Sequence, residues 1–72
     1  MKYPREETKQ VAEILWAETR ELHALAENIV IKLDKRDLPN ARKILAELRD
    51  RIHNAAERAR TLRIMTFKDD SR

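Results

Sequence analysis

The sequence contains no cysteine and no glycine, and serine occurs once, at Ser71. Without cysteine the chain can form neither a disulfide nor a thiolate metal site, which fits a reducing compartment. A single serine in the polar last residues argues against a serine nucleophile. Zinc needs three or four converging ligands, whereas one hairpin offers two histidines with a few nearby carboxylates, and the first helix lacks the Glu-x-x-His motif of ferritin-like metal sites. We therefore expect no cofactor and no metal site, and we predict that the protein is not an enzyme.

Long apolar runs are also missing. No stretch of 18 residues is free of charged side chains, so no transmembrane helix is expected. The first ten residues lack the apolar centre of a signal peptide. Together these absences predict a cytoplasmic protein that does not bind a membrane.

The chain is short, and its charge is unevenly distributed. Its 72 residues form one small domain at most, and such domains bury only about 60% of their unfolded surface. The core is therefore marginal unless self-association or a partner extends it. Residues 1–37 carry seven basic and eight acidic side chains, whereas residues 38–72 carry nine and five. This asymmetry favours an anionic partner or contact between oppositely charged helices.

The positions of the two prolines and of one aspartate predict two helices. Pro4 and Pro39 both suit the first turn of a helix, and Asp37 can cap a helix that begins directly after it. We predict helices over about 4–35 and about 38–65, a turn at about 36–38 and a frayed tail at 66–72. A connection this short turns the second helix back antiparallel to the first. The predicted fold is an all-α antiparallel helical hairpin.

Both predicted helices carry an apolar seam with spacings of three and four residues. In the second helix this seam is expected at Ala41, Leu45, Leu48, Ile52, Ala55, Ala59 and Leu62. In the first helix the main seam is expected at Val11, Leu15, Leu22, Ala26, Ile29 and Leu33. Glu18 interrupts this seam, and a buried carboxylate needs a partner. We expect an ion pair with Arg60, His53 or Arg63.

The first helix has a second apolar stripe. Trp16, His23 and Val30 are seven residues apart and lie about 90° from the main seam. The combined apolar arc of about 200° is about twice what one neighbouring helix covers. In an antiparallel hairpin the stripe shares a face with part of the second helix. The predicted face contains Trp16, His23, Val30, Arg42, Arg49, His53 and Arg60.

Three uses of this face stay open at this point. Two copies could stack it into the centre of a four-helix bundle, as a homodimer. Another protein could bind it, since tryptophan and arginine are common in binding hot spots. If the dimer uses this face, the partner surface is expected around Glu13, Arg20 and Glu27. Nucleic acid is the third candidate, because Arg42 and Arg49 align with Arg60 along the second helix.

In architecture the chain is similar to small dimeric helical hairpins such as the Rop-type plasmid RNA-binding proteins. The similarity consists of two antiparallel helices, a short turn and alanine alternating with leucine or isoleucine along the seam. It transfers no functional residue to this chain. The stretch RDLPNARKILAELRD also looks somewhat like a tetratricopeptide helix, but one hairpin cannot form that solenoid.

These observations predict a small, non-enzymatic regulatory or adaptor protein. It would bind a protein partner through a helical face and inhibit it. The alternative is a hairpin dimer that binds the backbone of RNA or DNA.

Overall fold

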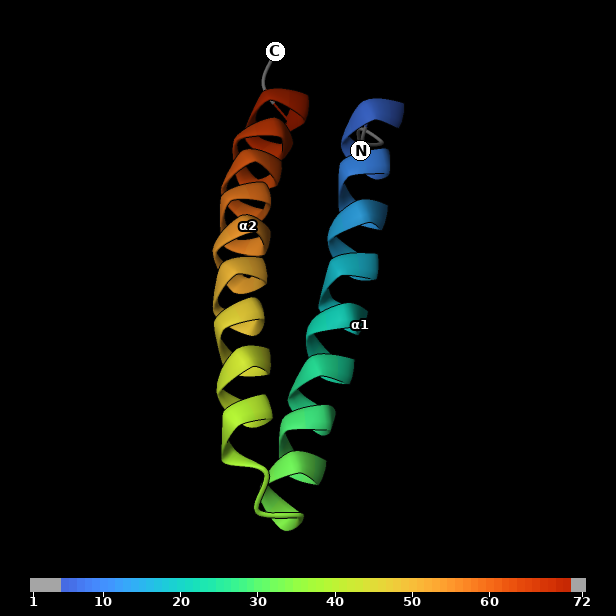
Figure 1. Ribbon diagram of the computed structural model, residues 1–72. Coiled ribbons are helices and arrows are strands. Elements are labelled where there is room, and N and C mark those ends of the chain that lie inside the picture. Colours follow the sequence, from blue (N-terminus) through green and yellow to red (C-terminus); the bar gives the residue numbers. More distant parts are fainter. Residues whose placement is uncertain (1–4, 71–72) are drawn as a thin grey trace.

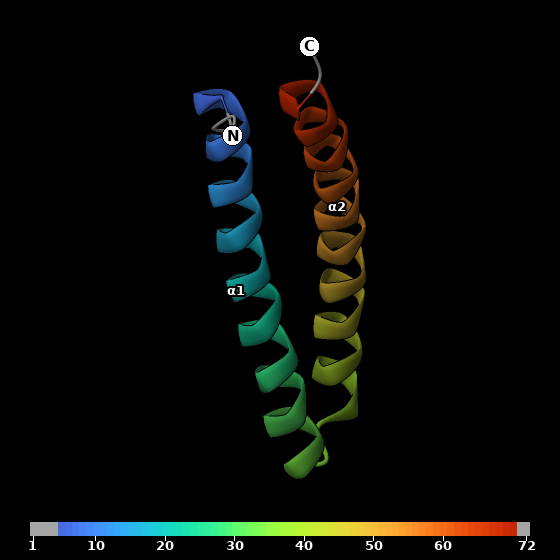
Figure 2. The same cartoon turned by 180° about the vertical axis from the view of Figure 1, so that it is seen from behind.

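The computed structural model describes residues 5–70, which form two helices, α1 (Glu6–Asp34) and α2 (Leu38–Asp70). The helices run antiparallel and form a rod of 55 × 15 × 14 Å (Figure 1). Seen from behind, they again lie side by side along their length, with the turn at one end (Figure 2). This confirms the predicted all-α helical hairpin. Pro4, predicted to open the first helix, lies outside the described residues.

The turn that ends α1 contains an arginine in a backbone conformation that is usually adopted by glycine. The Asp37 N–H donates to the Lys32 carbonyl at 2.8 Å, and the Arg36 N–H donates to the Leu33 carbonyl at 3.0 Å. This pair of hydrogen bonds is a Schellman motif, whose left-handed residue is usually glycine. Here Arg36 adopts the left-handed conformation, with φ of 57°. A side chain with a Cβ costs about 1 kcal/mol in this conformation.

Asp37 also begins α2, as predicted. Its Oδ1 accepts the backbone N–H of Asn40 at 3.4 Å, and its Oδ2 accepts the Asn40 side-chain amide at 2.7 Å. The hydrogen bond from the Asn40 side chain is the main reason why the pKa of Asp37 is lowered. One residue therefore closes the first helix and caps the second, which explains how so short a turn suffices.

The two helices meet along a regular seam. In α1 the seam consists of Thr8, Val11, Leu15, Glu18, Leu22, Leu25, Ile29 and Lys32. In α2 it consists of Ala41, Ile44, Leu48, Ala55, Arg58, Leu62, Met65 and Asp69, with Arg51 at the same spacing and more exposed. These positions alternate by three and four residues, as in an antiparallel coiled coil.

The predicted seam of α2 is wrong at several positions. We expected Leu45, Ile52 and Ala59 against α1, but all three are exposed. Their places are taken by the residues one position earlier, whereas Ala41, Leu48, Ala55 and Leu62 stay in the seam, so the helix is rolled by about 50° relative to the prediction. The physical reason is electrostatic: this roll brings arginines to the glutamates of α1, as described below.

The predicted end of α2 is also wrong, because the helix continues to Asp70 instead of fraying after about residue 65. Asp69 is held by α1. Thr8 Oγ1 donates to Asp69 Oδ2 at 2.6 Å, and the Arg5 backbone N–H donates to the same oxygen at 3.1 Å. Arg5 Nε also lies 3.5 Å from Asp69 Oδ1. A carboxylate is favoured here because the start of a helix is the positive end of its dipole. We call these three residues the terminal clasp.

Replacement of Arg36 by glycine should stabilise the hairpin. Glycine adopts the left-handed conformation without a Cβ penalty, so Arg36→Gly should raise the free energy of unfolding by about 0.5–1 kcal/mol. Thermal unfolding followed by circular dichroism should show a rise of about 3–6 °C. The matched control is Lys35→Gly, because Lys35 has a φ of −85° and gains nothing from glycine. An equal gain from both variants would contradict the explanation.

The two aspartates that hold the ends of the hairpin, Asp37 and Asp69, predict that its stability falls at acidic pH. Hydrogen bonds from Asn40 lower the pKa of Asp37, and one from Thr8 lowers the pKa of Asp69. A carboxylate with a lowered pKa in the folded state contributes stability above its unfolded pKa, near 3.8, and loses it as the pH falls through the folded value. Asp37→Asn keeps an oxygen acceptor but cannot titrate. Its melting temperature should fall less than that of the wild type between about pH 6 and about pH 3. Parallel curves would exclude this role.

Candidate functional site

Very little of the hairpin is fully buried. Among residues 5–70 the buried apolar side chains are Ile29, Ala41 and Ala55, and the buried polar one is Thr8. Two antiparallel helices can cover only the stripe that each presents to the other. The remaining apolar side chains must therefore lie at the surface.

Most of the large exposed apolar side chains lie on one side of the hairpin. In α1 they follow the seam residues Leu15, Leu22 and Ile29 by one or four positions, and the same offsets apply in α2. Turning in the same sense from the seam of two antiparallel helices leads to the same side of the pair. We call this side the apolar face. It consists of Ala12, Trp16, Ala26, Val30 and Leu33 of α1 and Leu38, Leu45, Ile52, Ala56 and Ala59 of α2.

The exposure of this face is large. Trp16 is 63% exposed, and Val30, Leu33, Leu38, Leu45 and Ile52 are each about half exposed. These six are the majority of the ten large apolar side chains that the described residues expose. Apolar patches of this extent on small proteins mark interaction sites.

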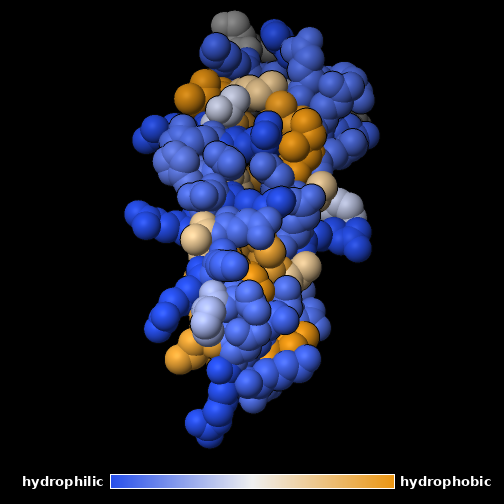
Figure 3. All heavy atoms as spheres, in the orientation of Figure 1, coloured by the Kyte–Doolittle hydropathy of each residue, from blue (hydrophilic) through white to orange (hydrophobic). Residues whose placement is uncertain are grey.

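The opposite side of the hairpin is polar. A groove between the helices is lined by Glu18, Glu21, Glu47, Asp50, Arg51 and Asn54. Figure 3 shows one face of the molecule, on which hydrophilic residues predominate and hydrophobic residues form small separate groups. The exposed Ile14, Ile31 and Ile64 belong to this polar side by their position relative to the seam. The hairpin is therefore amphipathic as a whole, because one side is apolar and the other charged.

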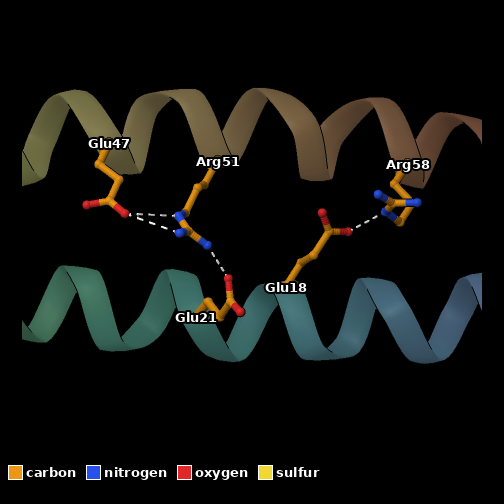
Figure 4. Close-up of polar contacts among 5 residues, drawn as sticks. All are labelled: Glu18, Glu21, Glu47, Arg51 and Arg58. Atoms are coloured by element: carbon orange, nitrogen blue, oxygen red, sulfur yellow. Dashed lines mark hydrogen bonds and ion pairs between the residues drawn. The ribbon is translucent and has the colours of Figure 1, made fainter.

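Ion pairs between α1 and α2 stabilise the observed rotation of α2 about its own axis (Figure 4). Arg58 Nε lies 2.5 Å from Glu18 Oε1, and the side chains are 39% and 24% exposed. Arg51 contacts Glu21 of α1 and, at 3.2 Å, Glu47 of its own helix. The ion pair of Glu18 is thus present, but the expected partners were wrong. The partner is Arg58 because the roll of α2 places Arg58 in the seam instead of Ala59.

All seven residues predicted for the interaction surface are exposed. Trp16 and Val30 belong to the apolar face, and His23 lies between them on the same side of α1. Arg42 and Arg49 form the edge of the face on α2. The two remaining residues, His53 and Arg60, follow the seam by five positions and so lie farther round, on the outer edge of α2.

Arg20 lies beside Trp16, the largest side chain of the apolar face. The guanidinium carbon of Arg20 lies 5.1 Å from the centre of the Trp16 ring, which is within cation–π range. Five members of the apolar face were expected in the seams: Ala26 and Leu33 of α1, and Leu45, Ile52 and Ala59 of α2. Both predicted seams are wrong at these positions, because each helix is rolled so that the residue one position earlier lies in the seam.

The described residues offer little for other chemistry. Within residues 5–70 no group of three histidine, cysteine, aspartate or glutamate side chains could hold a metal ion. Neither α1 nor α2 has an apolar stretch able to cross a lipid bilayer. No protein family, no characterised protein and no solved structure matches the sequence.

A double-mutant cycle should show that the Glu18–Arg58 pair contributes more than an ordinary surface pair. With Glu18→Gln and Arg58→Gln, the coupling free energy should be about 1 kcal/mol, because the pair is half-buried and hydrogen-bonded. The control is Glu47→Gln with Arg51→Gln, an exposed pair four residues apart, which should give about 0.3–0.5 kcal/mol. Urea unfolding at one fixed chain concentration measures both. Equal couplings would contradict a special role for Glu18.

Proposed function

We propose that this chain is a non-enzymatic protein-binding module, a cytoplasmic regulator or adaptor that acts through its apolar face. The observation that carries the proposal is the apolar face itself: six large side chains exposed on one side of a hairpin with a minimal core. Leaving such a face in water is costly, at about 25 cal/mol for each Å² of apolar surface. Covering it with another protein removes that cost.

The chemistry of the face suits a helical partner. Trp16 is a large anchor towards the open end of the face, and the alanines of α1 and α2 around it leave room for close approach by another helix. Arginines border the face on α2, at positions 42, 49 and 63. Amphipathic helices bind such surfaces through apolar anchors spaced three, four and seven residues apart. A partner bound in this way is inhibited when the helix it contributes belongs to its own functional surface.

Binding of nucleic acid is the second candidate. Arg42, Arg49 and Arg63 lie in one row along α2, spaced by seven or fourteen residues, and all are exposed. The number of free cations is lower than the sequence suggests, however. Arg51 and Arg58 are already paired with glutamates. A row of three arginines beside an apolar face favours a protein partner over a phosphate backbone.

The test of the proposed function compares two faces of the same hairpin. A partner captured by the tagged chain is identified, purified and titrated against wild type, Trp16→Ala and Ile14→Ala. Trp16→Ala should weaken binding about 30-fold, as expected for the loss of a large aromatic anchor of about 2 kcal/mol. Ile14→Ala, on the polar side, should change affinity less than about threefold. Equal losses would count against the apolar face.

Salt dependence separates the two candidates. Binding to a protein through an apolar face should change little between low and physiological salt. Binding to RNA or duplex DNA should weaken steeply, and Arg49→Ala should then affect it more than Trp16→Ala. Fluorescence anisotropy with a labelled RNA and a labelled DNA duplex provides this measurement.

A further inference from the structure

We infer that a second copy of this chain covers the apolar face, in one defined arrangement: α1 of each copy lies over α2 of the other, and both turns lie at the same end. This inference rests on the proposed function in that it takes the apolar face as a protein-docking surface, and it names the first protein that docks there.

The first argument is the area that the hairpin leaves exposed. A compact monomer of 8.6 kDa exposes about 4,700 Å² by the usual scaling with mass. The chain exposes 6256 Å². If a second copy removes the surplus from both chains, the interface buries about 3,100 Å² in total, which lies in the range of obligate homodimers. The hairpin has the surface of half a four-helix bundle.

The second argument is the charge along the edges of the face. The outer edge of α1 carries Glu13, Glu27 and Asp34, with Arg20 as its one cation, whereas α2 carries Arg42, Arg49 and Arg63. None of these three carboxylates and three α2 arginines forms a salt bridge within residues 5–70. Stacking α1 over α2 brings unlike charges together. Stacking α1 over α1 and α2 over α2, with the turns at opposite ends, brings like charges together.

The third argument is the level of these charges along the rod. The side-chain contacts across the two helices join residues whose numbers add up to between 72 and 77, so residues lie level when their numbers add up to about 75. In the proposed dimer the two-fold axis runs along the rod, so neither copy can slide relative to the other and the levels within one hairpin apply between copies. By this rule each of the three carboxylates meets one arginine of the other copy. The pairs are Glu13 with Arg63, Glu27 with Arg49, and Asp34 with Arg42.

The fourth argument is the size of the side chains that meet. By the same rule, Trp16 of one copy lies within about one helical turn of Ala56 and Ala59 of the other. The largest side chain of the face therefore meets its smallest ones. Knobs of this size need such small neighbours in the facing helix. Near the turn the face offers Val30 and Leu33 against Leu45 and Leu38, which fills the other end with aliphatic side chains.

The experiment begins with the mass of the purified chain alone, by light scattering across a dilution series. A dimer is expected, and Trp16→Ala should raise its dissociation constant at least about 30-fold. Because circular dichroism follows helicity at the same dilutions, dissociation is distinguished from unfolding. A folded monomer at all concentrations would overturn the inference. It would leave the proposed function intact, because the apolar face would then be free for another protein.

Charge reversal tests the arrangement. Glu27→Arg and Arg49→Glu should each raise the dissociation constant about tenfold, because each turns two symmetric attractions into repulsions. The double variant, with both reversals, should return to within about threefold of the wild type. Failure of the double variant to recover would overturn the pairing.

Cysteine cross-linking tests the same pairing directly, and the chain has no native cysteine to interfere. The variant with Glu27→Cys and Arg49→Cys should form a covalent dimer on mild oxidation. The control variant, with Glu13→Cys and Arg49→Cys, has its two cysteines at levels about 20 Å apart and should stay uncross-linked. Cross-linking of the control but not of the matched pair would show a different stacking and overturn the inference.

Discussion

The roll of α2 about its own axis decides what this hairpin presents to its surroundings, and the Glu18–Arg58 ion pair is the interaction that selects it. Glu18 lies in the seam of α1 and needs a cation within reach. Arg58 supplies that cation only when Leu45 and Ile52 face outward. One polar contact thus determines the side on which the large apolar residues of α2 lie. Exposing them is costly, because apolar surface in contact with water is unfavourable.

The energetic balance of the hairpin follows from its shape. Two helices in a rod of 15 × 14 Å in cross-section leave every residue within one layer of the surface. Few side chains can be fully buried in such a rod, and the polar contacts at both ends therefore matter more than they do in a larger domain. Asp37 fixes one end, and Asp69 fixes the other. Along the middle of the rod, large apolar side chains stay exposed on one side.

The fold could be predicted from the sequence because the signals that determine it are local. The absence of glycine, the cap at Asp37 and the periodic apolar residues each act within a few positions of the chain. The stripe of Trp16, His23 and Val30 was predicted for the same reason, because α1 carries more apolar positions than one neighbour covers. Two features could not be predicted from the sequence. The apolar residues of α2 fit two adjacent seams equally well, so periodicity alone could not choose between them. The contact of Asp69 with Thr8 spans 61 positions, and no local pattern predicts it.

The terminal clasp has a consequence for the unfolded chain as well. It joins residues near the two ends of the described chain, so it closes almost the whole hairpin into a ring. The loop entropy of such a ring is large: a covalent link at the same place would reduce the freedom of the unfolded chain by about 4 kcal/mol. The clasp itself can open, because it consists of hydrogen bonds and one ion pair at the surface. The two helices are joined covalently through the turn at Asp37 and only reversibly through Asp69. We therefore expect the helices to separate first at the end where Asp69 lies.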